Sequence, residues 1–97
     1  MPLKTRPFDP ASYLKTNAAR AAYLNDALET GDPTFIADAV GVLAKARGMS
    51  KVAKDAGLSR ESLYRALSTG GNPEFATVLK VVAALHLKLK AAPVGTP

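Results

Sequence analysis

The chain of 97 residues has no cysteine and only one histidine. Without cysteine it cannot form a disulfide or use a thiolate, and a lone histidine leaves no ligand set for a zinc cluster. No stretch approaches the roughly 18 apolar residues that a membrane span needs, and the N-terminal MPLKTRPFDP lacks the apolar run of a signal peptide. We therefore expect a soluble, cytoplasmic protein with no metal, no cofactor and no membrane contact.

Side chains suited to catalysis are also scarce. His86 falls near the end of a predicted helix, where a structural or surface role is expected for it. Asp26 and Glu29 share a helix face, but a lone acidic pair is usually solvated. The STGG stretch at 68–71 lacks the lysine and the flanking strand of a phosphate-binding loop. We expect no catalytic residue and no enzymatic activity.

Charge is distributed unevenly along the chain. Hydrophobic residues make up 47% of the sequence, which is enough for one small core, so we expect a single domain over residues 1–97. The formal net charge is +5, yet basic and acidic residues balance in the first 32 positions. Residues 33–97 hold nine Lys or Arg against four Asp or Glu. A basic half suggests a polyanionic partner, and ordinary solubility charge is the alternative.

Capping residues, prolines and glycines divide the chain into segments with helical patterns. The start signals, in chain order, are Asp9-Pro10, Asn17, Asp32-Pro33, Ser50, Ser59 and Asn72-Pro73. The stop signals are Gly31, Gly48, Gly57 and Gly70-Gly71. These signals predict an all-α domain of about five helices. Residues 1–31 form an N-terminal arm and helix, residues 33–86 form the core, and residues 87–97 form a short strand or a loose tail.

Apolar residues at helical spacing predict which faces are buried. On the helix after Asp32-Pro33 the predicted core face is Phe35, Ile36, Ala39, Val40 and Leu43. On the last helix it is Phe75, Val78, Leu79, Val82 and Leu85. The LKLK stretch at 87–90 alternates as a strand would, with both leucines on one side.

Residues 49–67, MSKVAKDAGLSRESLYRAL, have the spacing of a helix-turn-helix, which we place at 50–68. Ala53 is small and Gly57 follows four residues later, so two short helices can cross closely. Leu58 fills the turn between them. The second helix directs Leu63, Ala66 and Leu67 to the core and leaves a polar face outside. A plain helical corner with a solvated polar face is the alternative.

A helix held away from the body of a protein fits the major groove of DNA. Arg60 and Arg65 suit guanine edges or phosphates, Tyr64 suits a phosphate or a thymine methyl, and Glu61 can accept from cytosine. The predicted DNA-contacting residues are Ser50, Lys51, Ser59, Arg60, Glu61, Ser62, Tyr64, Arg65 and Asn72.

One short recognition helix covers only a few base pairs. Dimers solve this by reading two half-sites about 34 Å apart, so we expect a homodimer on an inverted-repeat operator. Antiparallel pairing of two LKLK segments would join the copies and cover the strand edges. A frayed tail after the last helix is the alternative for this segment.

From Gly48 to Ala91 the chain closely resembles the addiction-module antidote family, HigA-like antitoxins with an Xre-type helix-turn-helix. The most specific part is GLSRESLYRALS followed by GNP, and the resemblance covers roughly residues 10–92. His86 departs from the family, in which we expect glycine before the final LKL. The resemblance implies a lambda-repressor-like domain that binds operator DNA and represses its own promoter. It also implies a partner, a RelE/HigB-type toxin that cuts messenger RNA.

The face that would bind such a toxin does not follow from the motif. We place it on residues 8–30, because this region lies outside the basic half and adds a helix that a DNA-binding core does not require. The alternative is that this helix only completes the core. Two other functions share the same motif: a stand-alone phage-repressor-like regulator without a toxin, and a protein-interaction module that no longer binds DNA.

Overall fold

The computed structural model describes residues 14–68 and 72–95, which form five α-helices and no strand. The helices are α2 (Asn17–Glu29), α3 (Pro33–Arg47), α4 (Met49–Ala56), α5 (Arg60–Ala66) and α6 (Phe75–Ala84). The all-α prediction is thus confirmed for this part of the chain. The predicted arm and first helical turn before Leu14 lie outside the described residues, as do Gly70 and Gly71. No described helix combines the length and apolarity required to cross a bilayer.

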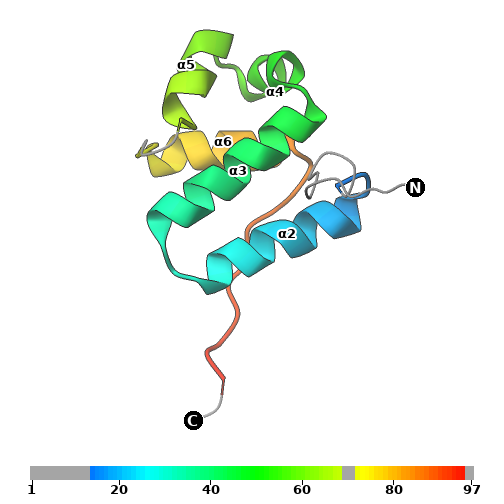
Figure 1. The fold of residues 1–97 in the computed structure, drawn as a ribbon, viewed down its shortest axis with the longest axis vertical. Coiled ribbons are helices and arrows are strands. Elements are labelled where there is room, and N and C mark those ends of the chain that lie inside the picture. The colour runs from blue at the N-terminus through cyan, green and yellow to red at the C-terminus, as the bar shows by residue number, and fades with distance from the viewer. Residues whose placement is uncertain (1–13, 69–71, 96–97) are drawn as a thin grey trace, which may run out of the picture.

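Helix α3 lies at the centre, with α2, α4 and α6 packed against it (Figure 1). Its neighbours bury more than one of its faces, which corrects the single stripe expected from the sequence. Phe35, predicted to be buried, is 52% exposed, whereas Ala37, Gly41 and Ala44 are buried. The largest fully buried side chains are Leu43, Leu63, Leu85, Val40, Val52, Val81 and Val82.

Two of the predicted helix starts are confirmed by their hydrogen bonds. The Asp32 carboxylate accepts from the backbone N–H of Thr34 at 3.0 Å, and Pro33 is the first residue of α3. The Ser59 hydroxyl oxygen accepts from the N–H of Ser62 at 2.9 Å at the start of α5. Both side chains accept hydrogen bonds from backbone N–H groups of the first helical turn, which have no carbonyl partner within the helix.

Three other predicted starts are wrong. Thr16, and not Asn17, caps α2, because its hydroxyl accepts from Ala19 at 3.0 Å and Asn17 is already helical. Ser50 lies inside α4, which begins directly after Gly48 with no side-chain cap. Asn72-Pro73 precedes α6 by two residues, since Glu74 keeps an extended conformation with ψ of 150°.

The buried face of α6 is rotated from the predicted one. Val81, Val82 and Leu85 are buried, whereas Phe75 and Leu79 are 68% and 43% exposed. The sequence FATVLKVVAA is apolar on nearly every side of the helix. The pattern therefore could not tell which side the rest of the fold would cover.

The first residues after α6 form neither a strand nor a loose tail. Residues 87–90 are extended, and Leu87 and Leu89 are half-buried against the core while Lys88 and Lys90 are exposed. The predicted alternation is therefore correct, but it serves packing within this chain. Residues 91–95 are exposed throughout. Figure 1 shows this segment passing behind α2 toward the end of the molecule opposite α4 and α5.

His86 adopts a left-handed backbone conformation with φ of 62°. Its N–H donates to the carbonyl of Ala83 at 2.9 Å, and the N–H of Leu87 reaches back to Val82 at 3.1 Å. These bonds satisfy carbonyls at the end of α6, in the arrangement for which glycine is preferred. The glycine expected at this position from the family resemblance therefore has a physical reason.

We predict that His86→Gly stabilises the fold by about 0.5–1 kcal/mol. A left-handed L-residue is strained by about 1–2 kcal/mol, and the greater freedom of glycine in the unfolded chain offsets roughly half of this. Urea unfolding should give a higher midpoint with an unchanged slope. His86→Ala removes the imidazole but keeps the strain, so it should give no increase. If both variants raised the unfolding midpoint equally, the gain would come from the loss of the imidazole and not from the relief of backbone strain.

Candidate nucleic-acid interface

Helices α4 and α5 are joined by a turn of three residues, Gly57 to Ser59. Gly57 is left-handed, with φ of 74°, and the Leu58 N–H donates to the carbonyl of Ala53 at 2.9 Å. This conformation favours glycine, because a side chain there would be strained. Leu58 is half-buried and packs against the core. Gly57 and Leu58 thus take the places in the turn that the sequence predicted, and backbone bonds to the carbonyls of Ala53 and Lys54 add to them.

Helix α5 is anchored by its inner face. Leu63 is fully buried and Leu67, directly after the helix, is 8% exposed. Gly41 of α3 lies beneath this end, where an added Cβ would come within 3.3 Å of the Leu67 carbonyl oxygen. A larger residue at position 41 would push the end of α5 outward. This role of Gly41 does not follow from the sequence, because an isolated glycine inside a helix carries no sign of the partner that approaches it.

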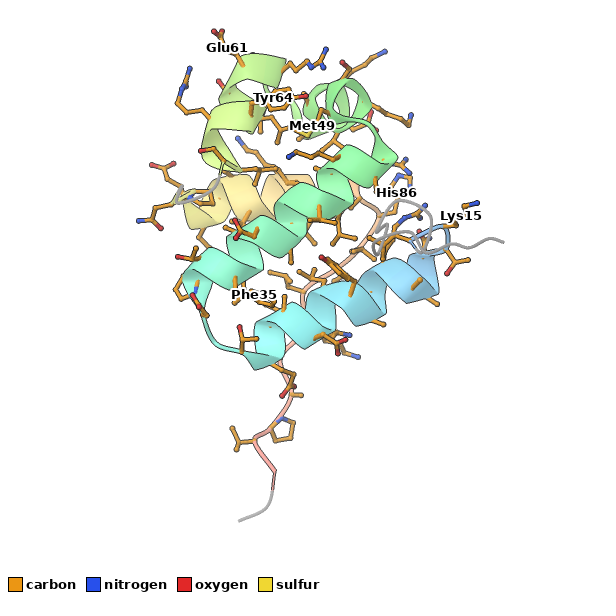
Figure 2. The ribbon with its side chains drawn as sticks, viewed as in Figure 1. Lys15, Phe35, Met49, Glu61, Tyr64 and His86 are labelled. Atoms are coloured by element: carbon orange, nitrogen blue, oxygen red, sulfur yellow. The ribbon has the colours of Figure 1, made fainter. Side chains whose placement is uncertain are left out.

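The outer face of α5 carries Arg60, Glu61, Tyr64 and Arg65, all exposed. Figure 2 shows Glu61 at the outer tip of the helix, away from the body of the molecule. One guanidinium nitrogen of Arg60 donates to the Tyr64 hydroxyl at 3.3 Å. The Arg60 Cζ also lies 5.4 Å from the centre of the Tyr64 ring, a cation–π contact. Arg60 is therefore held over the tyrosine and still has other donors free.

Positive charge exceeds negative charge on α4 and α5. Residues 49–66 hold four Lys or Arg against two Asp or Glu. Among the described residues the one ion pair joins Lys51 to Asp55 at 3.9 Å, within α4. Neither Arg60 nor Arg65 pairs with a carboxylate in that part of the chain. Two unpaired guanidinium groups on one exposed helix can bind phosphate oxygens or guanine edges.

The other predicted residues are not all on this face. Ser50 and Lys51 are exposed in the first turn of α4, and Ser62 is half-buried behind the Ser59 cap. Asn72 lies before α6 and lines a separate apolar pocket. Lys54 is also exposed, on the same helix as Lys51.

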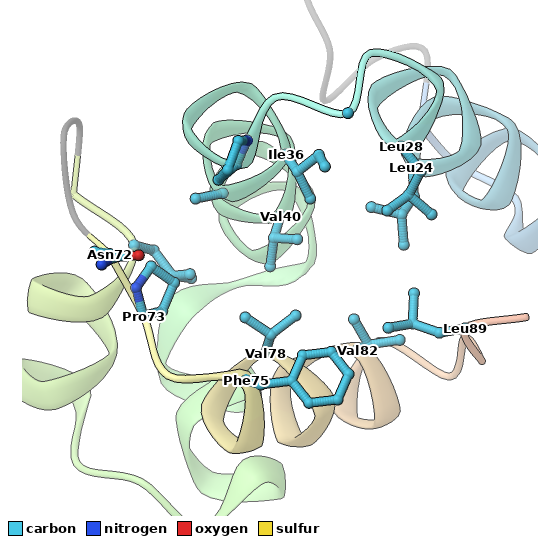
Figure 3. A pocket seen from close by; sticks show the side chains of 14 residues that line it. Leu24, Leu28, Ile36, Val40, Asn72, Pro73, Phe75, Val78, Val82 and Leu89 are labelled. Atoms are coloured by element: carbon cyan, nitrogen blue, oxygen red, sulfur yellow. The ribbon is translucent and has the colours of Figure 1, made fainter. Parts of the chain in front are cut away.

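The apolar pocket has a volume of about 300 Å³ and lies between α2, α3, α6 and the C-terminal segment. Figure 3 shows Ile36 and Val40 of α3 facing Val78 and Val82 of α6 across it. Asn72 is the sole polar side chain in its lining, so the pocket offers apolar contact and no group for acid–base chemistry. Within residues 14–68 and 72–95 no three His, Asp or Glu side chains gather as a metal site.

Comparison with known proteins identifies the family. The family model described as "Probable addiction module antidote protein" matches residues 4–93. A protein of Haemophilus influenzae, described as "Uncharacterized protein", is 48% identical over 83 residues, which cover 86% of each chain. No solved structure matches the chain. Because the family model spans nearly the whole sequence, this protein belongs to the family of addiction module antidote proteins.

Proposed function

We propose that this protein is the antitoxin of a type II toxin–antitoxin module. In this proposal residues 1–97 form one domain, which neutralises a RelE/HigB-type toxin and represses its own operon through α4 and α5. Membership of an antidote family supports a regulatory role and a toxin partner. The HigA-like and Xre-type assignment remains a prediction from the sequence resemblance.

One observation carries the DNA-binding part of the proposal. Arg60 and Arg65 are exposed on α5, have no carboxylate partner among the described residues, and stand on a helix anchored by Leu63. On an ordinary solvated helix, two exposed arginines would serve only solubility. A helix that enters the major groove requires them, for phosphates and for guanine.

A second candidate function is that of a stand-alone repressor without a toxin. It uses the same α4–α5 surface, so the DNA-binding residues do not separate the two. Membership of an antidote family favours the antitoxin. The two functions differ in whether a second protein binds the chain in stoichiometric amounts.

The exposed side of α6 supports the proposed homodimer. Phe75, Ala76, Leu79 and Ala83 are all exposed there, with Lys80 the only charge among them. Such a face is costly to leave in water and is typical of an association surface. We therefore replace the predicted LKLK pairing with α6 as the contact between copies, since Leu87 and Leu89 already pack within one chain.

We predict that Arg60→Ala and Arg65→Ala each weaken binding to promoter DNA by about 1–3 kcal/mol if the arginine reads a base. Fluorescence anisotropy across a salt series measures this, and wild-type affinity should fall steeply as salt rises because phosphate contacts release counterions. Arg20→Ala, on α2, removes the same charge elsewhere and should change affinity little. Losses of equal size on promoter and random DNA would make the arginines phosphate contacts. Unchanged binding in both variants would reject the interface.

The dimer proposal predicts that Leu79→Asp yields a monomer, because the change places a charge in the centre of the apolar α6 face. Analytical ultracentrifugation should detect the shift, and operator affinity should fall because one half-site alone is read. Val94→Asp is the matched control, since Val94 is 96% exposed in the C-terminal segment. A wild-type chain that stays monomeric even with operator DNA would contradict the dimer.

For the antitoxin function itself, we expect that co-expression with the neighbouring open reading frame gives a stoichiometric complex of the two proteins. Size-exclusion chromatography and mass spectrometry identify the partner. Added to an in vitro translation assay, the released partner should cut messenger RNA, and the antitoxin should stop the cutting. If the chain purifies alone and still binds its promoter, the stand-alone repressor is the correct function.

A further inference from the structure

A groove of about 420 Å³ lies between α2 and the extended segment after α6. On the α2 side its lining is small or uncharged: Asn17, Ala18, Ala21, Leu24 and Asn25. The other wall is His86 to Lys90. Figure 2 places His86 and the start of α2 on the same side of the molecule, away from Glu61 on α5. None of the residues that line the groove belongs to α4 or α5, which carry the proposed DNA-binding face.

In the wall formed by residues 88–90, the backbone polar groups have no backbone partner among residues 14–68 and 72–95. Among the described residues, no backbone hydrogen bond involves the N–H or C=O of Lys88, Leu89 or Lys90, and the last such bond in the chain is that of the Leu87 N–H. The segment is nonetheless held in place, because Leu87 and Leu89 pack on the core. An extended backbone whose donors and acceptors have no partner in the described part of the chain is a template for one more strand.

The charge of the groove determines which kind of strand could add to it. Lys88 and Lys90 are exposed, and the residues that line the groove include no Asp or Glu. On an added strand, the residues opposite these lysines lie within cross-strand distance of them, and opposite charges at such positions are stabilising. The complement of this surface is therefore an extended segment with acidic residues at alternate positions.

A second copy of the chain fits this wall poorly. If two such segments paired antiparallel with both leucine rows facing the cores, lysine would lie opposite lysine. Like charges directly opposite each other destabilise a strand pair. The exposed side of α6 offers copies of the chain an apolar contact without this repulsion.

We propose that the groove receives an extended, acidic segment of the toxin, which adds as a β-strand to Leu87–Lys90 with its carboxylates against Lys88 and Lys90. The identity of the partner rests on the proposed antitoxin function, and the chemistry of the groove does not. The proposal moves the toxin-binding surface from residues 8–30 alone to the junction of α2 with the C-terminal segment. It assigns α2 a part in the core as well, since Leu24 and Ala27 are buried.

The test compares Lys88→Glu/Lys90→Glu with Lys45→Glu/Lys54→Glu, which changes the net charge equally on exposed lysines outside both the groove and the α6 face. Both full-length variants are titrated against the co-expressed toxin. We expect the groove variant to lose toxin affinity by about tenfold or more, as two attractive pairs become repulsive, and the control to lose little. Equal affinity in both variants would overturn the inference and leave the antitoxin function intact.

A second measurement needs no toxin. The probe is a fluorescein-labelled peptide in which valine and glutamate alternate, together with a lysine counterpart and a version methylated at alternate backbone amides. Only the unmethylated glutamate peptide should bind the wild-type protein, and Lys88→Glu/Lys90→Glu should abolish that binding. Equal binding of the methylated peptide would reject strand addition, as would no binding at all. Peptide binding by a protein that captures no toxin would support the groove and reject the antitoxin function.

Discussion

The placement of α5 depends on the burial of Leu63 and Leu67. A helix of seven residues does not persist in water alone, because the cost of starting it exceeds what so few hydrogen bonds return. Its stability and its direction are therefore supplied by the core, with Leu63 fully buried and the Leu67 carbonyl lying close over Gly41. Arg60, Tyr64 and Arg65 point outward as a consequence of that anchoring.

The molecule separates three kinds of surface. The end formed by α4 and α5 is basic and presents charged side chains on a rigid support. The groove beside α2 offers backbone hydrogen-bonding groups and two lysines, and the outer face of α6 offers apolar side chains. In the proposals made above, nucleic acid, a partner protein and a second copy would each bind at a different one of these surfaces.

Local sequence signals predicted the helices of the candidate site closely. Asp32-Pro33, Gly57 and Ser59 act through their own backbone and nearest neighbours, so their effect is readable without the rest of the fold. Thr16 and Asn17 show a case in which local signals are not sufficient. Both are adjacent capping residues, and only the path of the chain into α2 decides which of them takes the role.

By itself the sequence determined that the chain is helical, where its turns lie and which residues of α5 are polar, because these follow from periodicity and backbone preference. Tertiary structure alone decided which side of α6 is buried, that Gly41 lies beneath α5, and that LKLK packs within one chain. In each of these cases the deciding contact joins residues far apart in sequence. Their apolar or small side chains would suit several neighbours equally, and only the assembled core selects among them.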